Sequence, residues 1–272
     1  QLKGVSTHGI AWLPQYVNKD AFQTLRDNYG INTIRLAMYT NKSEGYGPDA
    51  VNKVREGVKY ATELGMYVII DWHILNDGNP NQHKSEAKKF FTKMSKKYGG
   101  QKNVIYEICN EPNGNVTWNK QIKPYAKTIV KTIRKHSKNA VIVIGTPTWS
   151  QDVDVVAQSP LKGKNLMYAL HFYAATHKEW IQDKLKKAHK KGLPVMVTEF
   201  SICDASGNGA LDKASARKWM KLLDKYNISY TAWSLCNKNE SSALIESSCN
   251  KTSGWTRSDL SPAGKWYFDQ TK

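Results

Sequence analysis

The sequence predicts an α/β fold, a closed (β/α)₈ or TIM barrel, and two observations lead to that prediction. Short apolar, β-branched runs alternate with longer amphipathic segments along the whole chain, which is the pattern of a parallel sheet with crossover helices. There are eight such runs in 272 residues, and one barrel needs about 250 residues. Because no linker, low-complexity tract or internal repeat divides the chain, residues 1–272 are expected to form one domain.

The predicted strands are rich in β-branched and aromatic side chains, which suit an extended backbone. In chain order they cover residues 4–8, 33–39, 67–73, 103–110, 140–145, 167–173, 195–199 and 230–235.

The predicted helices carry apolar residues at helical spacing. They cover residues 19–28, 49–64, 85–98, 119–136, 179–189, 213–226 and 262–269. Asp49 is the expected N-cap of its helix, and Ser85 is expected to open another with Glu86 in the first turn. Gly30, Gly65 and Gly192 follow helical segments, where a left-handed C-terminal residue is easily accommodated by glycine.

The chain is strongly basic, with 40 Lys and Arg against 23 Asp and Glu and a formal net charge of +17. Such a charge raises the hypothesis of nucleic-acid binding. The lysines recur at helical spacing, however, so they indicate solvated outer helix faces with a diffuse attraction to anionic polymers. No nucleic-acid partner is therefore expected.

No stretch approaches the roughly 20 apolar residues that a membrane-spanning helix needs. The chain begins at Gln1, with neither Met nor an apolar leader. We therefore expect a processed, secreted, soluble chain with no membrane partner. Cys236 and Cys249 flank one loop and are candidates for a disulfide, whereas Cys109 lies in an apolar run and is expected to be a buried thiol.

Polar and aromatic residues collect where the predicted strands end, which is where such barrels build their active sites. They are His8, Arg35, Tyr39, His73, Asn110, Glu111, Trp149, His171, Tyr173, Glu199 and Trp233. Glu111 and Glu199 each close an apolar run. Cleavage of a glycosidic bond needs one protonated and one ionised carboxyl group, so the pair predicts a glycoside hydrolase.

Seven motifs in order along the chain resemble glycoside hydrolase family 5. They are Ser6-Thr7-His8-Gly9, Ile34-Arg35-Leu36-Ala37-Met38-Tyr39, Asp71-Trp72-His73, Asn110-Glu111-Pro112, His171-Phe172-Tyr173, Thr198-Glu199-Phe200 and Trp233-Ser234. The first motif and the late Asn237-Lys238-Asn239-Glu240-Ser241-Ser242 resemble the endo-β-1,4-glucanase (cellulase) branch. The resemblance implies hydrolysis of β-1,4-glucosidic bonds in cellulose and related β-glucans.

The resemblance also implies the roles of the catalytic residues. Glu111 would be the acid/base and Glu199 the nucleophile of a retaining double displacement, with carboxyl groups about 5 to 5.5 Å apart. Arg35 and Tyr173 would keep Glu199 ionised, and His171 would assist Glu111. His73 completes the catalytic set, and Asn110 would bind the 2-hydroxyl of the reacting sugar.

Aromatic platforms are expected along the cleft, because the apolar faces of sugar rings stack on indole and phenol rings. The resemblance places Trp233 under the reacting sugar and Trp149 on the leaving-group side. Trp12 and Tyr39 would lie on the non-reducing side, where Lys238 and Glu240 would bind hydroxyl groups, and His8 is a further substrate-binding candidate. The remaining tryptophans, Trp118, Trp180, Trp219, Trp255 and Trp266, are assigned to packing, and Glu107 to a structural polar contact.

Several alternatives accompany this interpretation. His8, His73 and His171 could be zinc ligands, but no His-x-Glu or His-Glu-x-x-His spacing supports a metal, and no metal or cofactor is expected. The same chemistry could act on mannan, xylan or xyloglucan, since loops select the sugar. A non-catalytic glycan-binding barrel is the alternative from another class. The expected partner is a polysaccharide, and the expected state is a monomer.

Overall fold

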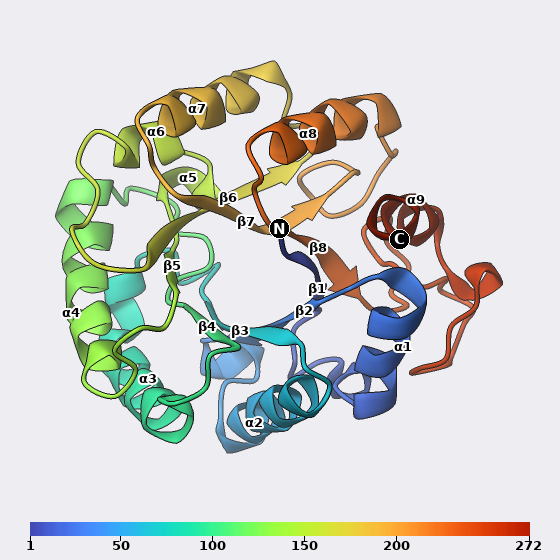
Figure 1. The fold of residues 1–272 in the computed structure, drawn as a ribbon, viewed down its shortest axis with the longest axis horizontal. Helices are drawn as coiled ribbons and strands as arrows, with labels where there is room; N and C mark the ends of the chain where they lie inside the picture. The colour runs from blue at the N-terminus through green and yellow to red at the C-terminus, as the bar shows by residue number, and fades with distance from the viewer.

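The computed structural model, which describes residues 1–272, is a closed barrel of eight parallel strands ordered β1 to β8 (Figure 1). The predicted (β/α)₈ fold is therefore confirmed. The strands are β1 (Lys3–Thr7), β2 (Thr33–Tyr39), β3 (Tyr67–His73), β4 (Val104–Glu107), β5 (Ile142–Ile144), β6 (Leu166–Tyr173), β7 (Val195–Ser201) and β8 (Tyr230–Leu235).

The helices surround the barrel (Figure 1). They are α1 (Lys19–Tyr29), α2 (Pro48–Glu63), α3 (Lys84–Tyr98), α4 (Lys123–Arg134), α5 (Pro147–Ser150), α6 (Val153–Val156), α7 (Glu179–Lys190), α8 (Lys213–Lys225) and α9 (Pro262–Thr271). None of them is long and apolar enough to cross a membrane.

Three strands, β2, β3 and β8, have the predicted bounds, and the main differences lie at β4 and in the helix starts. β4 ends at Glu107, although the backbone N–H groups of Ile108 and Asn110 still donate to Val143 of β5 and Trp72 of β3 before the loop that carries Glu111. The predicted N-cap at Asp49 is wrong: Gly47 is the N-cap and Pro48 occupies the first turn, where its missing N–H costs nothing. Gly30 does adopt the predicted left-handed conformation, with φ of 69°.

The strands present different residues to the two sides of the barrel wall, because successive side chains alternate. The inward residues at the amino ends are apolar and form a small core inside the barrel: Ile69, Ile105, Val143, Ala169 and Met196. Two residues further along the same strands, the inward positions are ionisable: Asp71 on β3, Glu107 on β4 and His171 on β6. An apolar core at the amino ends of the strands thus supports a layer of ionisable residues nearer their carboxyl ends.

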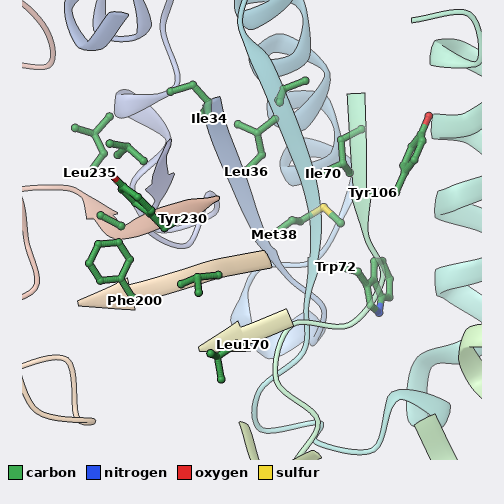
Figure 2. Packing of buried hydrophobic residues seen from close by; sticks show 14 of the residues in the cluster. Ile34, Leu36, Met38, Ile70, Trp72, Tyr106, Leu170, Phe200, Tyr230 and Leu235 are labelled. Carbon is green, nitrogen blue, oxygen red and sulfur yellow. The ribbon is translucent and has the colours of Figure 1, made fainter. Parts of the chain in front are cut away.

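The outward strand residues pack against the helices in the main core of 73 buried residues. Figure 2 shows Ile34, Leu36 and Met38 along β2 beside Ile70 and Trp72 of β3, with Phe200 and Tyr230 on the neighbouring β7 and β8. Because this shell is apolar and continuous around the barrel, it fixes the strand ends that carry the polar residues.

Two further expectations differ from the structure. The four cysteines are free, so the Cys236–Cys249 bridge is absent: the Cys236 thiol contacts Ser234, and the Cys249 thiol contacts Asp259. Trp180 is 52% exposed, so its assignment to packing is wrong. Trp118, Trp219, Trp255 and Trp266 are buried as predicted.

Candidate active site

A cleft of about 650 Å³ lies at the carboxyl ends of the strands. Twelve predicted site residues line it: His8, Trp12, Tyr39, His73, Glu111, Trp149, His171, Tyr173, Glu199, Trp233, Lys238 and Glu240. Arg35 and Asn110 do not line the cleft. They are fully buried and hydrogen bond to residues that do, namely Glu199 and His73. Segments from all over the sequence therefore converge on one site.

Glu199 reaches the site through an irregularity in β7. The register between β7 and β8 shifts between Val197 and Phe200, which both belong to the outer core. The two residues between them, Thr198 and Glu199, both contact polar groups of the barrel interior. A β-bulge commonly re-aims a side chain beside an active site, and this one brings two consecutive residues into it.

The Glu199 carboxylate accepts two hydrogen bonds. Arg35 Nη1 donates to Oε1 at 3.0 Å, and the Tyr173 hydroxyl donates to Oε2 at 2.7 Å. Burial alone would raise the pKa of Glu199, but the positive charges of His171 and Arg35 and the bond from Tyr173 bring it below its ordinary value. Glu199 is therefore held ionised, with both oxygen atoms fixed in place.

Glu111 lies in an opposite electrostatic environment. Burial and the nearby negative charge of Glu199 raise the pKa of Glu111 above its ordinary value, although a bond to His171 opposes that rise. Glu111 Oε2 lies 2.8 Å from His171 Nδ1. One side-chain nitrogen or oxygen atom from each of Glu111, His171 and Glu199 lies within 4.8 Å of those of the other two. Two carboxyl groups with opposite pKa shifts thus face each other across a short gap.

His171 links Glu111 to the polar interior. Its Nε2 lies 2.7 Å from the Thr198 hydroxyl, which donates to Glu107 Oε2 at 2.6 Å. Burial alone would lower the pKa of His171, but its interactions with Glu107 and Glu111 raise that pKa to about 9. The imidazolium form can then donate Nδ1–H to Glu111 and Nε2–H to Thr198.

Arg35 is the centre of a buried ionic network. Its guanidinium group contacts Glu107 at 2.8 Å and both Asp71 and Glu199 at 3.0 Å. It also donates to Asn110 Oδ1 at 2.6 Å. Burial alone would lower the pKa of Arg35, but the three acids raise it, so the group remains a cation. The same cation lowers the pKa of Glu107 to about 2 against the effect of burial.

His73 forms the floor of the cleft on the side of β3, and the buried Asn110 contacts it. His73 Nδ1 lies 2.5 Å from Asp71, and its ring stacks on Trp233 with centroids 5.3 Å apart. The Asn110 amide nitrogen donates to the Ile74 carbonyl and lies 3.3 Å from His73 Nε2. These bonds fix the orientation of both side chains before any ligand enters.

One wall of the cleft is aromatic. The Trp12 and Tyr39 rings lie 4.7 Å apart, Tyr39 continues to His73, and His8 lies between Trp12 and Trp233. Trp12 is 49% exposed and Trp149 is 45% exposed, and both line the cleft. His8 also lies 3.5 Å from Lys238 and 3.7 Å from Glu240, so stacking and hydrogen-bonding groups adjoin each other there.

Trp149 is held in a turn of unusual backbone conformation. Thr148, Trp149 and Ser150 all have positive φ, between 53° and 59°, which costs non-glycine residues about 1 kcal/mol or more each. Hydrogen bonds offset that cost. The Trp149 N–H donates to the Pro112 carbonyl, and the Ser150 hydroxyl donates to the Asn110 carbonyl. The turn thereby ties Trp149 to the loop that carries Glu111.

Some residues of the site were not predicted from the sequence. Asp71 and Thr198 contact the catalytic candidates, and Leu75, Gln151, His177, Ala205, Ser206 and Gly207 line the cleft. Asp71 could have been found, because it is a lone acid within an apolar strand. Loop residues such as Gln151 and His177 carry no comparable signal. The exposed Trp180 ring packs edge-on against His177, with centroids 5.8 Å apart.

Glu111, His171 and Glu199 form the one cluster whose spacing could hold a metal ion. Both oxygens of Glu199 already accept bonds from Arg35 and Tyr173, and a cation would also meet the Arg35 guanidinium group. The donor set therefore suits carboxylate chemistry better than metal binding. His8 and His73 do not join this cluster, so the alternative of three histidine ligands is not supported.

The family described as "Cellulase (glycosyl hydrolase family 5)" matches residues 1–239. The chain therefore belongs to glycosyl hydrolase family 5, as its motifs predicted.

Among curated relatives, an endoglucanase of Clostridium saccharobutylicum is 49% identical over 97% of this chain and 59% of its own length. Endoglucanase 5 of Pectobacterium carotovorum is 46% identical over 100% of this chain and 54% of its own. This chain thus spans little more than half of these relatives.

Among solved structures, a protein from Cytophaga hutchinsonii is 38% identical, with a TM-score of 0.95, over 100% of this chain and 88% of its own. The endoglucanase catalytic domain of Thermobifida fusca in complex with cellotetraose is 33% identical, with a TM-score of 0.94, over 100% and 91%.

Proposed function

We propose that this chain is a retaining endo-β-1,4-glucanase that hydrolyses internal bonds of cellulose and related β-glucans. The observation that carries the proposal is the pairing of Glu111 and Glu199, with oppositely shifted pKa values, within 4.8 Å at the floor of the cleft. Retaining enzymes need carboxyl groups about 5 to 5.5 Å apart, whereas inverting enzymes need roughly 6.5 to 9.5 Å. The short gap favours retention.

In the proposed first step, Glu199 attacks the anomeric carbon and the glycosidic bond breaks. Glu111 gives its proton to the departing oxygen, and a covalent glycosyl ester forms on Glu199. Arg35 and Tyr173 keep the attacking oxygen ionised and oriented before substrate binds. In the second step Glu111 takes a proton from water, and the resulting hydroxide displaces Glu199.

The proton of Glu111 is shared with His171 in this proposal. The 2.8 Å contact lets the pair hold one proton between Oε2 and Nδ1. Glu111 can thereby act first as an acid and then as a base without an external proton carrier. Thr198 and Glu107 anchor the other side of the imidazole and keep it aimed at Glu111.

The cleft walls support a glucan as the substrate. Trp12, Tyr39, Trp149 and Trp233 offer ring faces for stacking, and the relatives with cellulase and endoglucanase names support the β-1,4-glucan class. Asn110 stays the proposed partner of the 2-hydroxyl, and because it is buried beside His73, that bond requires the reacting sugar to reach the floor of the cleft. We further propose that the chain acts as a secreted monomer, with a polysaccharide as its only partner and without a cofactor.

Product analysis tests this function. Cellopentaose is incubated with the enzyme, and the anomer formed first is followed by NMR. Retention predicts that the β-anomer appears first and that cleavage falls at internal bonds. Release of the α-anomer would contradict the mechanism, and faster turnover of a mannan or xylan would reassign the substrate.

The variant Glu199→Gln removes the nucleophile and is expected to lower kcat by roughly 10⁴-fold or more while cellopentaose still binds. The exposed Glu63→Gln is the matched control and should keep full activity. Unchanged turnover in Glu199→Gln would leave only a glycan-binding role for the pair of glutamates.

A further inference from the structure

One flank of the barrel carries most of the positive charge. Between Glu86 and Asp152 the sequence has thirteen Lys and Arg residues and only two acids, Glu107 and Glu111, a formal balance of +11 out of +17. Both of those acids are buried, Glu107 inside the barrel and Glu111 at the cleft. The exposed lysines of this segment, here called the α3–α4 face, are Lys88, Lys89, Lys93, Lys96, Lys97, Lys102, Lys120, Lys127, Lys131, Lys135 and Lys138.

No residue of the α3–α4 face takes part in a salt bridge. The other basic helices are only partly unpaired: Lys184 and Lys186 of α7 pair with Asp152 and Asp183, and Lys218 of α8 pairs with Glu179, although further lysines of both helices have no acidic partner. Like charges three or four residues apart on a helix destabilise it by a few tenths of a kcal/mol per pair. The α3–α4 face therefore carries a repulsion that a bound anion would relieve.

The lysines form two adjacent rows. α3 and α4 pack side by side on the outside of the barrel (Figure 1). Lys89, Lys93 and Lys97 recur every four residues on α3, and Lys127 and Lys131 do so on α4. Four residues correspond to a rise of about 6 Å, and packed helices lie roughly 8 to 10 Å apart. The face thus presents a regular track of cations, which suits a linear polymer with regularly spaced anions.

The side chains of the face argue against a nucleic acid as that polymer. Its aromatic residues, Phe90, Phe91, Tyr98 and Tyr125, are all buried, so none can stack on a base. Its single arginine, Arg134, donates to the backbone carbonyls of Ser137, Ala140 and Lys164. Arg134 therefore has no free guanidinium edge for bidentate contact with a phosphate group. The lysines that remain on the face offer only single point charges.

We propose that the α3–α4 face binds a carboxylate-bearing polysaccharide, a linear polyuronate, while the cleft holds a neutral glucan. The choice of a glycan rests on the proposed function, since an enzyme that cuts one polysaccharide meets others in the same material. The face lies on the outer wall of the barrel and the cleft lies at the strand ends, so both polymers can be bound at once. The anionic polymer then concentrates the enzyme near its substrate.

Two variants of equal net charge test the proposal. The first neutralises the face, with Lys89→Gln, Lys93→Gln, Lys97→Gln, Lys127→Gln and Lys131→Gln. The control neutralises five exposed, unpaired lysines of the opposite flank, with Lys187→Gln, Lys190→Gln, Lys191→Gln, Lys213→Gln and Lys221→Gln. Affinity for immobilised polygalacturonate and for random-sequence double-stranded DNA is measured at low and physiological salt, with cellopentaose hydrolysis as the measure of an intact active site.

The face variant is expected to lose about tenfold or more of its affinity for polygalacturonate, and the control less than about threefold. Both should hydrolyse cellopentaose at the wild-type rate. Equal losses in the two variants would show that the attraction is diffuse, and tighter binding of DNA than of polygalacturonate would assign the face to nucleic acid. If the wild type binds polygalacturonate but does not cleave cellopentaose, the proposed function is refuted, whereas the polyuronate-binding role of the α3–α4 face is retained.

Discussion

The mouth of the barrel and the α3–α4 face are both rich in charged residues, but the charges at the mouth are buried and paired, whereas those on the face are exposed and unpaired. At the mouth, Arg35 is completely buried and contacts Asp71, Glu107 and Glu199. On the face, the lysines are exposed and have no acidic partner. Burying a charge costs several kcal/mol unless it is paired, whereas an exposed charge is solvated at little cost. Single substitutions should therefore have large effects at the mouth and only small, cumulative effects on the face.

The largest expected effect on stability comes from Arg35→Gln. This change leaves Asp71, Glu107 and Glu199 as buried acids without their cation, and it should lower the free energy of unfolding by about 3 to 5 kcal/mol. Urea unfolding followed by tryptophan fluorescence measures the difference. The control is Arg257→Gln, which breaks the exposed pair with Asp269 and should shift the unfolding midpoint little. Equal shifts in the two variants would contradict the contrast between buried and exposed charge.

A second prediction concerns pH and His171. Its folded pKa of about 9 lies above the ordinary value of 6.5, so protonated His171 stabilises the fold below pH 6.5. That contribution is lost as the pH rises through about 9. The free energy of unfolding of the wild type should therefore fall between neutral and alkaline pH, and His171→Gln should remove part of this fall.

The same titration should appear in catalysis. Above about pH 9 the proton shared by His171 and Glu111 is lost, so kcat/KM of the wild type should decrease on the alkaline side. In His171→Gln, Glu111 holds the proton alone, and the alkaline limb should move to lower pH. A pH profile of cellopentaose hydrolysis checks this, and an unchanged alkaline limb would remove His171 from the proton pathway.

The smallest expected effect belongs to the α3–α4 face. Carboxymethylcellulose carries carboxylates and cellopentaose does not, so only the former can be attracted by the exposed lysines. Raising the salt concentration should increase the apparent KM for carboxymethylcellulose by a few fold and leave that for cellopentaose constant. In the variant with five neutralised lysines on the face, this salt dependence should largely disappear. A salt effect that is equal for both substrates would point to the cleft instead.

The parts of the molecule that the sequence predicted are those governed by local patterns. Alternating apolar runs predicted the eight strands, and the polar and aromatic residues at their ends predicted nine of the 18 residues that line the cleft. The bulge that turns both Thr198 and Glu199 inward left no comparable signal, because it is a property of pairing between β7 and β8. Asp71 does have a recognisable signal, since it is the only acid in the apolar strand of residues 67–73.

The turn around Trp149 shows why the rest could not be predicted. Thr148, Trp149 and Ser150 contain no glycine, yet all three adopt positive φ. Hydrogen bonds to Asn110 and Pro112, nearly 40 residues away, impose that conformation. The exposure of Trp180 likewise depends on its position on α7 and not on local sequence. Tertiary contacts overrule local preference at these places.

The central claim is that Glu199 is the nucleophile and Glu111 is not. A cellobioside with fluorine at carbon 2 and an activated leaving group slows both steps and makes the glycosyl-enzyme long-lived enough to isolate. Mass spectrometry of the digested protein should find the glycosyl group on the peptide that contains Glu199, in one-to-one stoichiometry with lost activity. A label on Glu111, or complete turnover with no labelled protein and an inverted product, would contradict the account.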